Sequence, residues 1–487
     1  MRKRQNTILL NCHERKDLPE MDKYLQNMKF LFNPSSVAVV GASQNPGKLG
    51  FHVMKSLTNG GFPGKIFPIN PGGQEIMGIS CYPTLAACGD MVDLAIVVVP
   101  ASVVPTVFQE CVKNRVKGIV LITAGFKEIE DPQGAVLHEQ LAAIADRAQI
   151  PVIGPNTFGM INFHARLNAS FTPEFSLLKK GHIALVSQSG GMSHLLGFLG
   201  IRDNAGFSKI VGLGNRLNVD FAQMIEYLCE DSQTKAIALY VEGIDDPGSL
   251  VEKAKAVTGR KPIVAYKTGS AHVGDQASLS HTGSVAGKHD IYLAAFRQAG
   301  IVTVPDSQQL LDVAKAFAYC PIPRGKGIAV LSGQAGPGMA GSDICEREGL
   351  EIVSFTPQTQ AKINSLLPPL ALRTNPVDMG PAWYDASAIA GIVKAVMDDD
   401  NVGGILLFMM FASANVDAVS GMADLLKSWN QRKPVISCML SPPGIWDEQV
   451  CELEECGAIV NYSTPERAAR AMAALCKWAK MTRKNKG

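Results

Sequence analysis

The sequence predicts an α/β protein with three successive parallel-sheet domains, a Rossmann-like one followed by two flavodoxin-like ones. Apolar, β-branched strand segments alternate with helical segments along the whole chain, the pattern of parallel sheets covered by helices on both faces. Three of the strands also run directly into a glycine-rich turn and a helix, at residues 36–57, 180–192 and 327–348. A length of 487 residues is itself too great for one core and fits about three domains.

The composition excludes several classes of protein. Hydrophobic residues make up 46% and charged residues 18% of the chain, which is typical of a compact rather than a disordered protein. A net charge of +2 provides no general basic field for nucleic acid. The 11 cysteines form no CxxC pair, so we expect no metal site and no disulfide framework, and a cytoplasmic location. No segment is long enough to span a membrane, and the apolar run near the N-terminus is too short for a signal peptide.

Linker and turn signals divide the chain into four parts. Residues 1–29 are expected to be an N-terminal extension. The Rossmann-like domain follows at residues 30–172 and the first flavodoxin-like domain at residues 173–320. The proline-rich segment Cys320-Pro-Ile-Pro-Arg then leads into the second flavodoxin-like domain, residues 321–487.

The first domain is expected to bind a phosphate-bearing ligand where its strands end. The strand from Ser36 enters a turn at Gly41 and then a helix, the arrangement in which loop amides face a phosphate. Gly41, Gly47 and Gly50 do not have the G-x-G-x-x-G spacing. The alternative interpretation, an NAD-dependent dehydrogenase, therefore depends on Gly41 and its neighbours alone.

The second domain carries the candidate reacting groups. Its first strand ends in a turn whose hydroxyls and amides would form an anion site at a helix N-terminus, provided by Ser187, Ser189, Gly190 and Gly191. A later strand delivers Glu242 at its carboxyl end, and a glycine- and serine-rich loop, residues 277–287, carries His281 just before a helix. A carboxylate bonded to one imidazole nitrogen makes the other nitrogen more basic, so that it can attack phosphorus.

Each of these residues also has an ordinary interpretation. A histidine in such a loop more often packs or caps than reacts, and Glu242 beside Asp245 and Asp246 could be a surface glutamate.

Several motifs, taken in order, carry a resemblance to a known family. VAVVGAS-x3-GKLG at residues 37–50, then VDLAIVVVPA, ITAGF and IGPNTFG, resemble the CoA-binding domain of the succinyl-CoA synthetase superfamily. The most similar subgroup is the nucleoside-diphosphate-forming acyl-CoA synthetases, which include ADP-forming acetate–CoA ligase. The resemblance implies a CoA site made by Gly41, Ser43, Lys48, Asn70, Pro100, Thr123 and Asn156. Thr157 stands where succinyl-CoA synthetases have cysteine.

The later motifs resemble the ligase part of the same family. The segment from Lys267 to Gly287 resembles its phosphohistidine loop, with His281 as nucleophile, and YVEG resembles the strand with the orienting Glu242. Asp275 replaces a residue that is basic in many relatives. The resemblance also implies that Gly336 and Gly338, before a helix of the third domain, offer a second helix dipole to the phosphohistidine. It implies an α-type subunit that interconverts acyl-CoA plus phosphate with carboxylic acid plus CoA, through an acyl phosphate and a phosphohistidine.

No ATP-grasp elements are found in this sequence. ATP or ADP, with Mg, would therefore bind a partner ATP-grasp chain in a hetero-oligomer. The alternative from a different class is a non-catalytic CoA-binding regulatory or scaffold protein.

Overall fold

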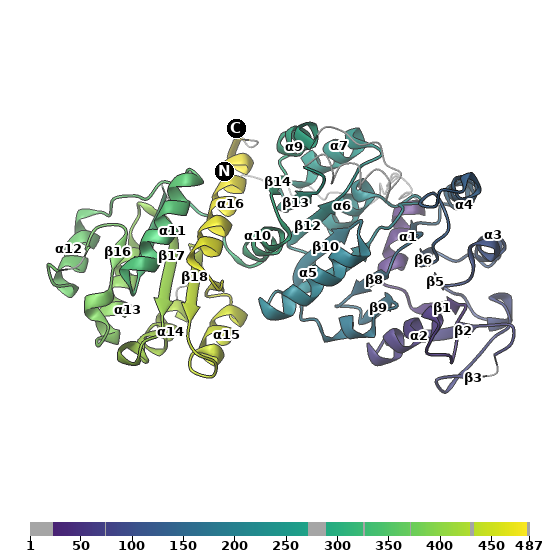
Figure 1. Cartoon of the computed structure of the whole chain (residues 1–487), viewed down its shortest axis with the longest axis horizontal. Coiled ribbons are helices and arrows are strands. Elements are labelled where there is room, and N and C mark those ends of the chain that lie inside the picture. The colour runs from purple at the N-terminus through teal and green to yellow at the C-terminus, as the bar shows by residue number, and fades with distance from the viewer. Residues whose placement is uncertain are drawn as a thin grey trace, which may run out of the picture.

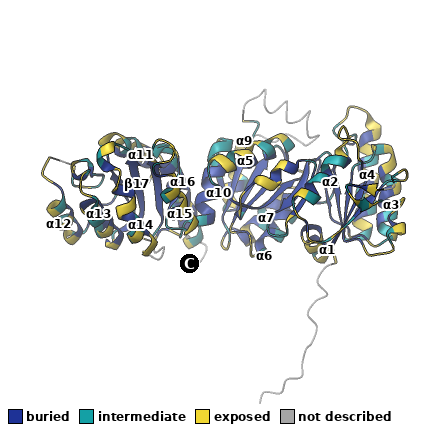
Figure 2. Ribbon diagram, turned by 90° about the horizontal axis from the view of Figure 1, so that it is seen from below, coloured by how far each residue is buried: buried dark blue, intermediate teal, exposed yellow. Residues whose placement is uncertain are grey.

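The structure, a computed structural model, describes residues 23–73, 75–270, 289–324, 327–370, 372–428 and 433–484. Within these ranges the chain forms three domains in a row, each a mostly parallel sheet between helices (Figure 1). The strands are buried and the helices expose only their outer sides (Figure 2). This architecture confirms the predicted α/β fold class. Among the residues described, no helix is long and apolar enough to cross a membrane.

The first domain has a five-stranded sheet in the order β2-β1-β5-β6-β7, with every neighbouring pair parallel. Its central strand, Ser-Val-Ala-Val-Val, is buried at all five positions, as expected for a strand covered on both faces. Its elements are α1 (Lys23–Phe32), β1 (Ser36–Val40), α2 (Leu49–Asn59), β2 (Lys65–Ile69), β3 (Glu75–Ile76), β4 (Ile79–Ser80), β5 (Leu94–Val97), α3 (Val104–Lys113), β6 (Gly118–Leu121), α4 (Pro132–Ala148) and β7 (Val152–Ile153).

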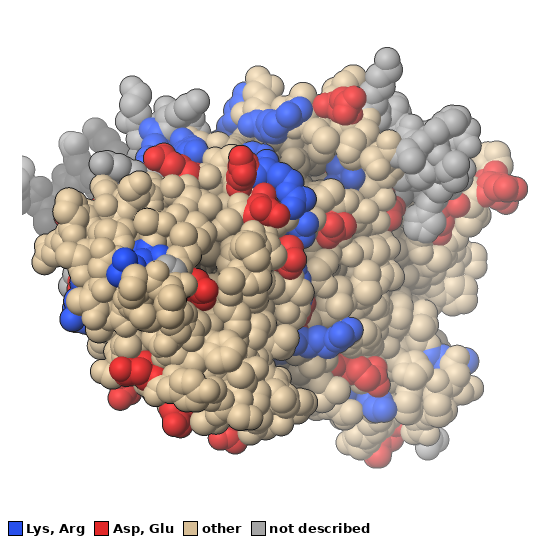
Figure 3. Space-filling model, turned by 60° about the vertical axis from the view of Figure 1, so that its left-hand side comes forward, with Lys and Arg blue, Asp and Glu red and all other residues tan. Residues whose placement is uncertain are grey.

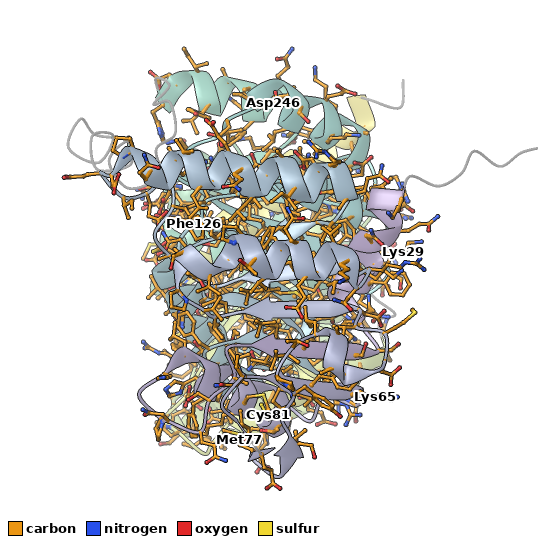
Figure 4. The ribbon with its side chains drawn as sticks, turned by 90° about the vertical axis from the view of Figure 1, so that its right-hand side faces the viewer. Lys29, Lys65, Met77, Cys81, Phe126 and Asp246 are labelled. Atoms are coloured by element: carbon orange, nitrogen blue, oxygen red, sulfur yellow. The ribbon has the colours of Figure 1, made fainter. Side chains whose placement is uncertain are left out.

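Figure 4 shows this domain from its outer side, where α3 and α4 lie over the sheet. Met77 and Cys81 lie together at the end of the domain that carries β3 and β4, far from Asp246 of the second domain. The sequence signals for the second of these helices are plain. Pro132 occupies its first turn, and the Asp131 side chain accepts a hydrogen bond from the Gln133 amide.

The second domain has seven strands in the order β14-β13-β12-β10-β11-β8-β9. The five parallel strands follow the flavodoxin-like order 2-1-3-4-5, and β8 and β9 form an antiparallel hairpin beside β11. The elements are β8 (Gly159–Asn162), β9 (Leu167–Ser170), β10 (Lys180–Ser187), α5 (Gly190–Arg202), β11 (Phe207–Gly212), α6 (Phe221–Glu230), β12 (Ala236–Val241), α7 (Pro247–Val257), β13 (Ile263–Lys267), α9 (His289–Gln298), β14 (Val302–Val304) and α10 (Ser307–Tyr319).

The third domain repeats the flavodoxin-like order in its sheet β16-β15-β17-β18-β19. Acidic and basic side chains are interspersed over the face of this domain seen in Figure 3, in keeping with the small net charge. The elements are β15 (Gly327–Ser332), α11 (Ala335–Arg347), α12 (Pro357–Leu366), β16 (Val377–Asp378), α13 (Ala386–Asp398), β17 (Val402–Met410), α14 (Ala418–Ser428), β18 (Val435–Leu440), α15 (Asp447–Glu455), β19 (Val460–Asn461) and α16 (Pro465–Lys484).

Two elements of the structure cross the domain boundaries expected from the sequence. The hairpin at residues 159–170 pairs with β11 of the second sheet, although the boundary was expected after residue 172. Helix α1 begins at Lys23, within the expected extension. The side-chain amide of its Asn27 donates to the Gln149 carbonyl at 2.8 Å. Apolar residues from the first two sheets form one continuous cluster, so these two domains share a core.

Buried ion pairs join the third domain to the second. Arg467 of α16 contacts Asp203, at the end of α5, at 2.8 Å and Asp312 of α10 at 2.6 Å. Nearby, the Lys315 ammonium contacts Glu454 at 2.7 Å. Asp203, Asp312 and Arg467 together form the ion cluster between the two domains.

Helix α16 also contributes to the core of the second domain. Trp478 is buried against Phe317 of α10, and its indole N–H donates to the Thr258 carbonyl at 3.0 Å. Ala474 and Leu475 join the same apolar cluster, which is centred on the second sheet.

Candidate active site

A cleft of about 500 Å³ lies where the carboxyl ends of strands from the first two sheets face each other. This is the edge at which parallel sheets place their functional side chains. The first domain contributes Leu49, Ile122, Ala124, Asn156, Thr157 and Phe158 to its lining. The second contributes Phe171, Gln188, Ser189, Gly190, Gly191, His194, Gly214, Asn215 and Glu242.

Glu242 is half-buried at the end of β12 and lines this cleft. Its position is set by the backbone, because the amides of Glu242 and Gly243 both donate to Oε1 of Gln188, at 2.6 and 3.0 Å. Tyr240, two residues earlier, is buried; burial raises the pKa of its phenol to about 12, and the negative charge of Glu242 adds to the rise. The structure therefore places a carboxylate at the predicted strand end.

The N-terminal turn of α5 forms another part of the same cleft. Ser189 caps this helix, because its Oγ accepts a hydrogen bond from the Met192 amide at 3.3 Å. The Ser187 hydroxyl donates to the Ser189 carbonyl at 2.8 Å and so shapes the turn without lining the cleft. Gly190 and Gly191, which have no side chains to block an approaching ligand, are the first residues of the helix. A helix N-terminus of this kind favours a negatively charged group.

A buried arginine holds the loop that follows Glu242. Arg216 is 5% exposed; its Nη1 donates to the Gly243 carbonyl and its Nη2 to Asp245, each at 2.7 Å. Its Nε lies 3.4 Å from Asp220, whose pKa is raised by burial. These contacts fix the direction in which the chain leaves β12.

Sequence reasoning did not identify Arg216, Gln188, His194 or Asn215 as site residues. Gln188 was within a motif already quoted, but nothing in the letters distinguishes it from its neighbours. The two ring nitrogens of His194 are 2.8 Å from the Thr172 hydroxyl and 2.7 Å from the Gly190 carbonyl. This histidine therefore supports the first turn of α5 from within the cleft.

The residues predicted to bind CoA gather along the carboxyl edge of the first sheet. Gly41 follows β1 with φ +96°, and a Cβ there would lie 2.8 Å from the Val98 carbonyl oxygen. Only glycine accepts both the left-handed backbone and this close approach. The turn lies between β1 and β5, where the order of the strands reverses, which is where such sheets bind ligands.

Side chains join the neighbouring strand ends at this edge. The Asn70 side-chain amide donates to the Ala42 carbonyl at 2.8 Å, and the Thr123 hydroxyl donates to the Val99 carbonyl at 2.7 Å. Ser43 is buried, and its Oγ accepts from the Asn45 amide at 3.0 Å. The two remaining residues on this edge, Lys48 at the start of α2 and Pro100 after β5, are exposed.

Asn156 is in the left-handed region with φ 56° and lines the cleft, so it connects the first-domain edge with the second-domain site. Gly336 and Gly338 lie in the first turn of α11 in the third domain and are not part of the cleft lining. His281 lies outside the described residues. On its N-terminal side, β13 runs parallel to β12, and Val241 is paired with Lys267.

A crevice of Rossmann type, opening onto a helix N-terminus and a carboxylate in a flavodoxin-like domain, fits the class of the succinyl-CoA ligases that the sequence motifs resemble. Two family profiles agree with this class. A "CoA binding domain" matches residues 35–162, and a "Succinyl-CoA ligase like flavodoxin domain" matches residues 180–317.

Relatives identify the family more closely. The α subunit of ADP-forming acetate–CoA ligase II from Pyrococcus furiosus is 37% identical, over 93% of this chain and 98% of that protein. ADP-forming acetate–CoA ligase I of Archaeoglobus fulgidus is 36% identical, and the match covers 94% of this chain but 65% of that longer protein. A solved structure, dinucleotide-forming acetyl-coenzyme A synthetase 1 of Candidatus Korarchaeum cryptofilum with phosphate and ADP, has a TM-score of 0.87, 34% identity and coverage of 94% and 97%.

The chain belongs to the ADP-forming acyl-CoA synthetases, the family of the acetate–CoA ligase α subunits, and it is an enzyme of the ligase class. The family predicted from the sequence motifs is thereby confirmed.

Proposed function

We propose that this chain is the α-type subunit of an ADP-forming acid–CoA ligase and that His281 is its phosphoryl carrier. The observation that carries the proposal is the joint position of Glu242 and the first turn of α5 in one cleft, which Asn156 connects with the ligand edge of the first domain. In this arrangement a thioester from the first domain and an anion in the second would meet.

The proposed reaction has three steps. Phosphate oxygen attacks the acyl carbon of acyl-CoA, the C–S bond breaks, and CoA leaves as the thiol from an acyl phosphate. The imidazole of His281 then attacks phosphorus, and the P–O bond to the acyl group breaks, which releases the carboxylate. In the last step ADP takes the phosphoryl group from the histidine and becomes ATP.

The residues of this chain act mainly by position and charge, which are what phosphoryl transfer requires. The first turn of α5 would stabilise the negative phosphoryl oxygens, and Glu242 would orient the imidazole and stabilise its positive charge. Lys48 would offer a flexible point charge to the CoA phosphates, since it is exposed at the crevice of the first domain.

We further propose that ATP or ADP, with Mg, binds a partner ATP-grasp subunit. The relative from Pyrococcus furiosus is named as an α subunit, and the Archaeoglobus fulgidus protein continues well beyond the region this chain matches. Both observations fit a family in which the nucleotide-binding part is sometimes fused to the α-type part and sometimes a separate subunit. The third domain would add a second helix N-terminus through Gly336 and Gly338.

A labelling experiment tests the carrier without the partner. Purified chain is incubated with acetyl-CoA and radiolabelled inorganic phosphate, and protein-bound phosphate is measured after treatment with acid and with base. We expect base-stable, acid-labile label on the wild type and none on H281A. If the wild type binds CoA but takes up no label from acetyl-CoA or a set of other short acyl-CoA esters, the chain is a CoA-binding regulatory or scaffold protein instead. Label that persists on H281A would place the nucleophile elsewhere.

A further inference from the structure

Gln188 lies between β10 and α5, is 5% exposed, and lines the cleft. Its side-chain oxygen accepts two backbone amides, those of Glu242 and Gly243. A side-chain NH₂ group cannot accept a hydrogen bond, so these two contacts determine which end of the amide is oxygen. The Nε2 end takes no part in these two contacts.

This Nε2 is fully buried and has no hydrogen-bond partner within the part of the chain that the structure describes. Leaving a buried donor without an acceptor is unfavourable, and native proteins seldom do so without a reason. The atom belongs to a residue of the cleft lining, next to Ser189 and Gly190 at the anion-favouring end of α5. A ligand oxygen at this helix end would supply the missing acceptor.

The third domain provides an internal comparison. Gln334 also follows the first strand of its sheet and also contacts the end of the neighbouring central strand, at Met410 of β17. In Gln334, both the oxygen and the nitrogen of the side-chain amide form hydrogen bonds with the backbone. Oε1 accepts from the Met410 amide at 3.1 Å, and Nε2 donates to the Met410 carbonyl at 2.6 Å. Holding a strand end therefore does not require an unused donor, and of these two glutamines the one in the cleft keeps such a donor.

We propose that Gln188 is a catalytic residue whose Nε2–H donates a hydrogen bond to a phosphoryl oxygen held at the first turn of α5. Its other end simultaneously holds the backbone of Glu242, so one side chain sets the carboxylate and the phosphoryl group relative to each other. This assignment rests on the proposed phosphoryl-transfer function and names a further residue of that site.

The two roles can be separated by Q188E. The glutamate keeps an oxygen for the two backbone amides but replaces the donor with a second, negatively charged oxygen. We expect the melting temperature to fall, because a buried negative oxygen without a partner is costly, but the dissociation constant for CoA should stay close to the wild-type value. The dissociation constant for inorganic phosphate, measured by titration calorimetry, should rise about 10- to 100-fold, the usual effect of losing a hydrogen bond to a charged group. The matched control Q360E, at a glutamine of α12 whose Nε2 donates to the Arg373 carbonyl, should bind phosphate within about twofold of the wild type.

A measurement on the wild type makes the test independent of how well the variant folds. In protein labelled with ¹⁵N-glutamine, the side-chain NH₂ resonance of Gln188, assigned by its absence from Q188M, should shift when phosphate is added. Equal phosphate binding by wild type and Q188E, or an unmoved resonance at saturating phosphate, would overturn the role of Gln188. If phosphohistidine still formed in those samples, the proposed function would stand without it. A wild type that neither binds phosphate nor becomes labelled would overturn both.

Discussion

Replacing Arg467 by methionine tests whether the ion cluster holds the third domain against the second. The methionine keeps the apolar stem and removes the cation, which leaves Asp203 and Asp312 facing each other. The three side chains are 15%, 17% and 3% exposed, so water screens this repulsion poorly. Removing one partner of a buried ion pair costs about 3–5 kcal/mol. At about 2–4 °C per kcal/mol for domains of this size, the melting temperature should fall by about 6–20 °C.

The assay is differential scanning calorimetry of the wild type, R467M and a surface control, R260M. Arg260 contacts Glu230 at 2.8 Å, but the two side chains are 60% and 71% exposed. An exposed ion pair contributes at most about 1 kcal/mol, so the control should melt within a few degrees of the wild type. A loss in R467M no larger than that in R260M would refute the assigned role of the cluster.

The pH dependence gives a second, independent readout. Burial raises the pKa of the Asp312 carboxyl, and Arg467 opposes that rise. Without the arginine, the pKa in the folded protein moves further above the unfolded value of about 3.9. A raised folded-state pKa contributes stability that is present at low pH and is lost as the pH rises through that pKa. The deficit of R467M relative to the wild type should therefore shrink as the pH is lowered from about 7 towards 4, and a constant deficit would contradict the reasoning.

Three further outcomes follow from the site and the first domain. K48M should weaken CoA binding about 10- to 100-fold, and the loss should be larger at low salt. The control K113M, at an exposed position on α3, should bind CoA like the wild type. Equal affinities of K48M and wild type in calorimetry would remove Lys48 from the site. G50A would place a Cβ 2.0 Å from a backbone oxygen of the turn after β1. It should lower the free energy of unfolding, measured in denaturant, by about 1–3 kcal/mol. In the control G336A the new Cβ meets no atom within 4 Å, so its free energy of unfolding should match the wild type. E242Q should lower the rate of histidine phosphorylation about 10²- to 10⁴-fold with an unchanged melting temperature; phosphorylation at the wild-type rate would show that the carboxylate is not needed.

Local patterns were sufficient to predict the strands and the turns that follow them. The strand expected at the start of residues 327–348 is Gly327–Ser332 in the structure, and Glu242 directly follows a buried strand as predicted. Both predictions depend on neighbouring residues alone, since an apolar β-branched run ending in glycine behaves similarly in any parallel sheet. The gathering of Gly41, Asn70 and Thr123 at one edge follows from the parallel order of the strands.

Features that depend on distant pairing were not predictable in this way. The hairpin β8–β9 joins the second sheet because Ile161 pairs with Ile210, almost fifty residues later. Helix α1 is held by contacts such as the Tyr24 hydroxyl with the Asn218 carbonyl at 2.9 Å. Gln188 acquires its distinctive environment from the backbone after β12, and this pairing leaves no trace in the residues around it. Sequence periodicity reports which face is apolar, but not which distant segment covers it.

The position of the last helix has a consequence for how the chain matures. Because Trp478 and Leu475 complete the core of the second domain, that domain cannot finish folding when its own last residue emerges from the ribosome. It must wait for the C-terminal helix, some 150 residues later, while domains usually fold as units during synthesis. A break in the linker before β15 would therefore yield no independent second domain. The two fragments would have to reassemble around α16, and premature termination within the last helix would damage a domain that had already been fully translated.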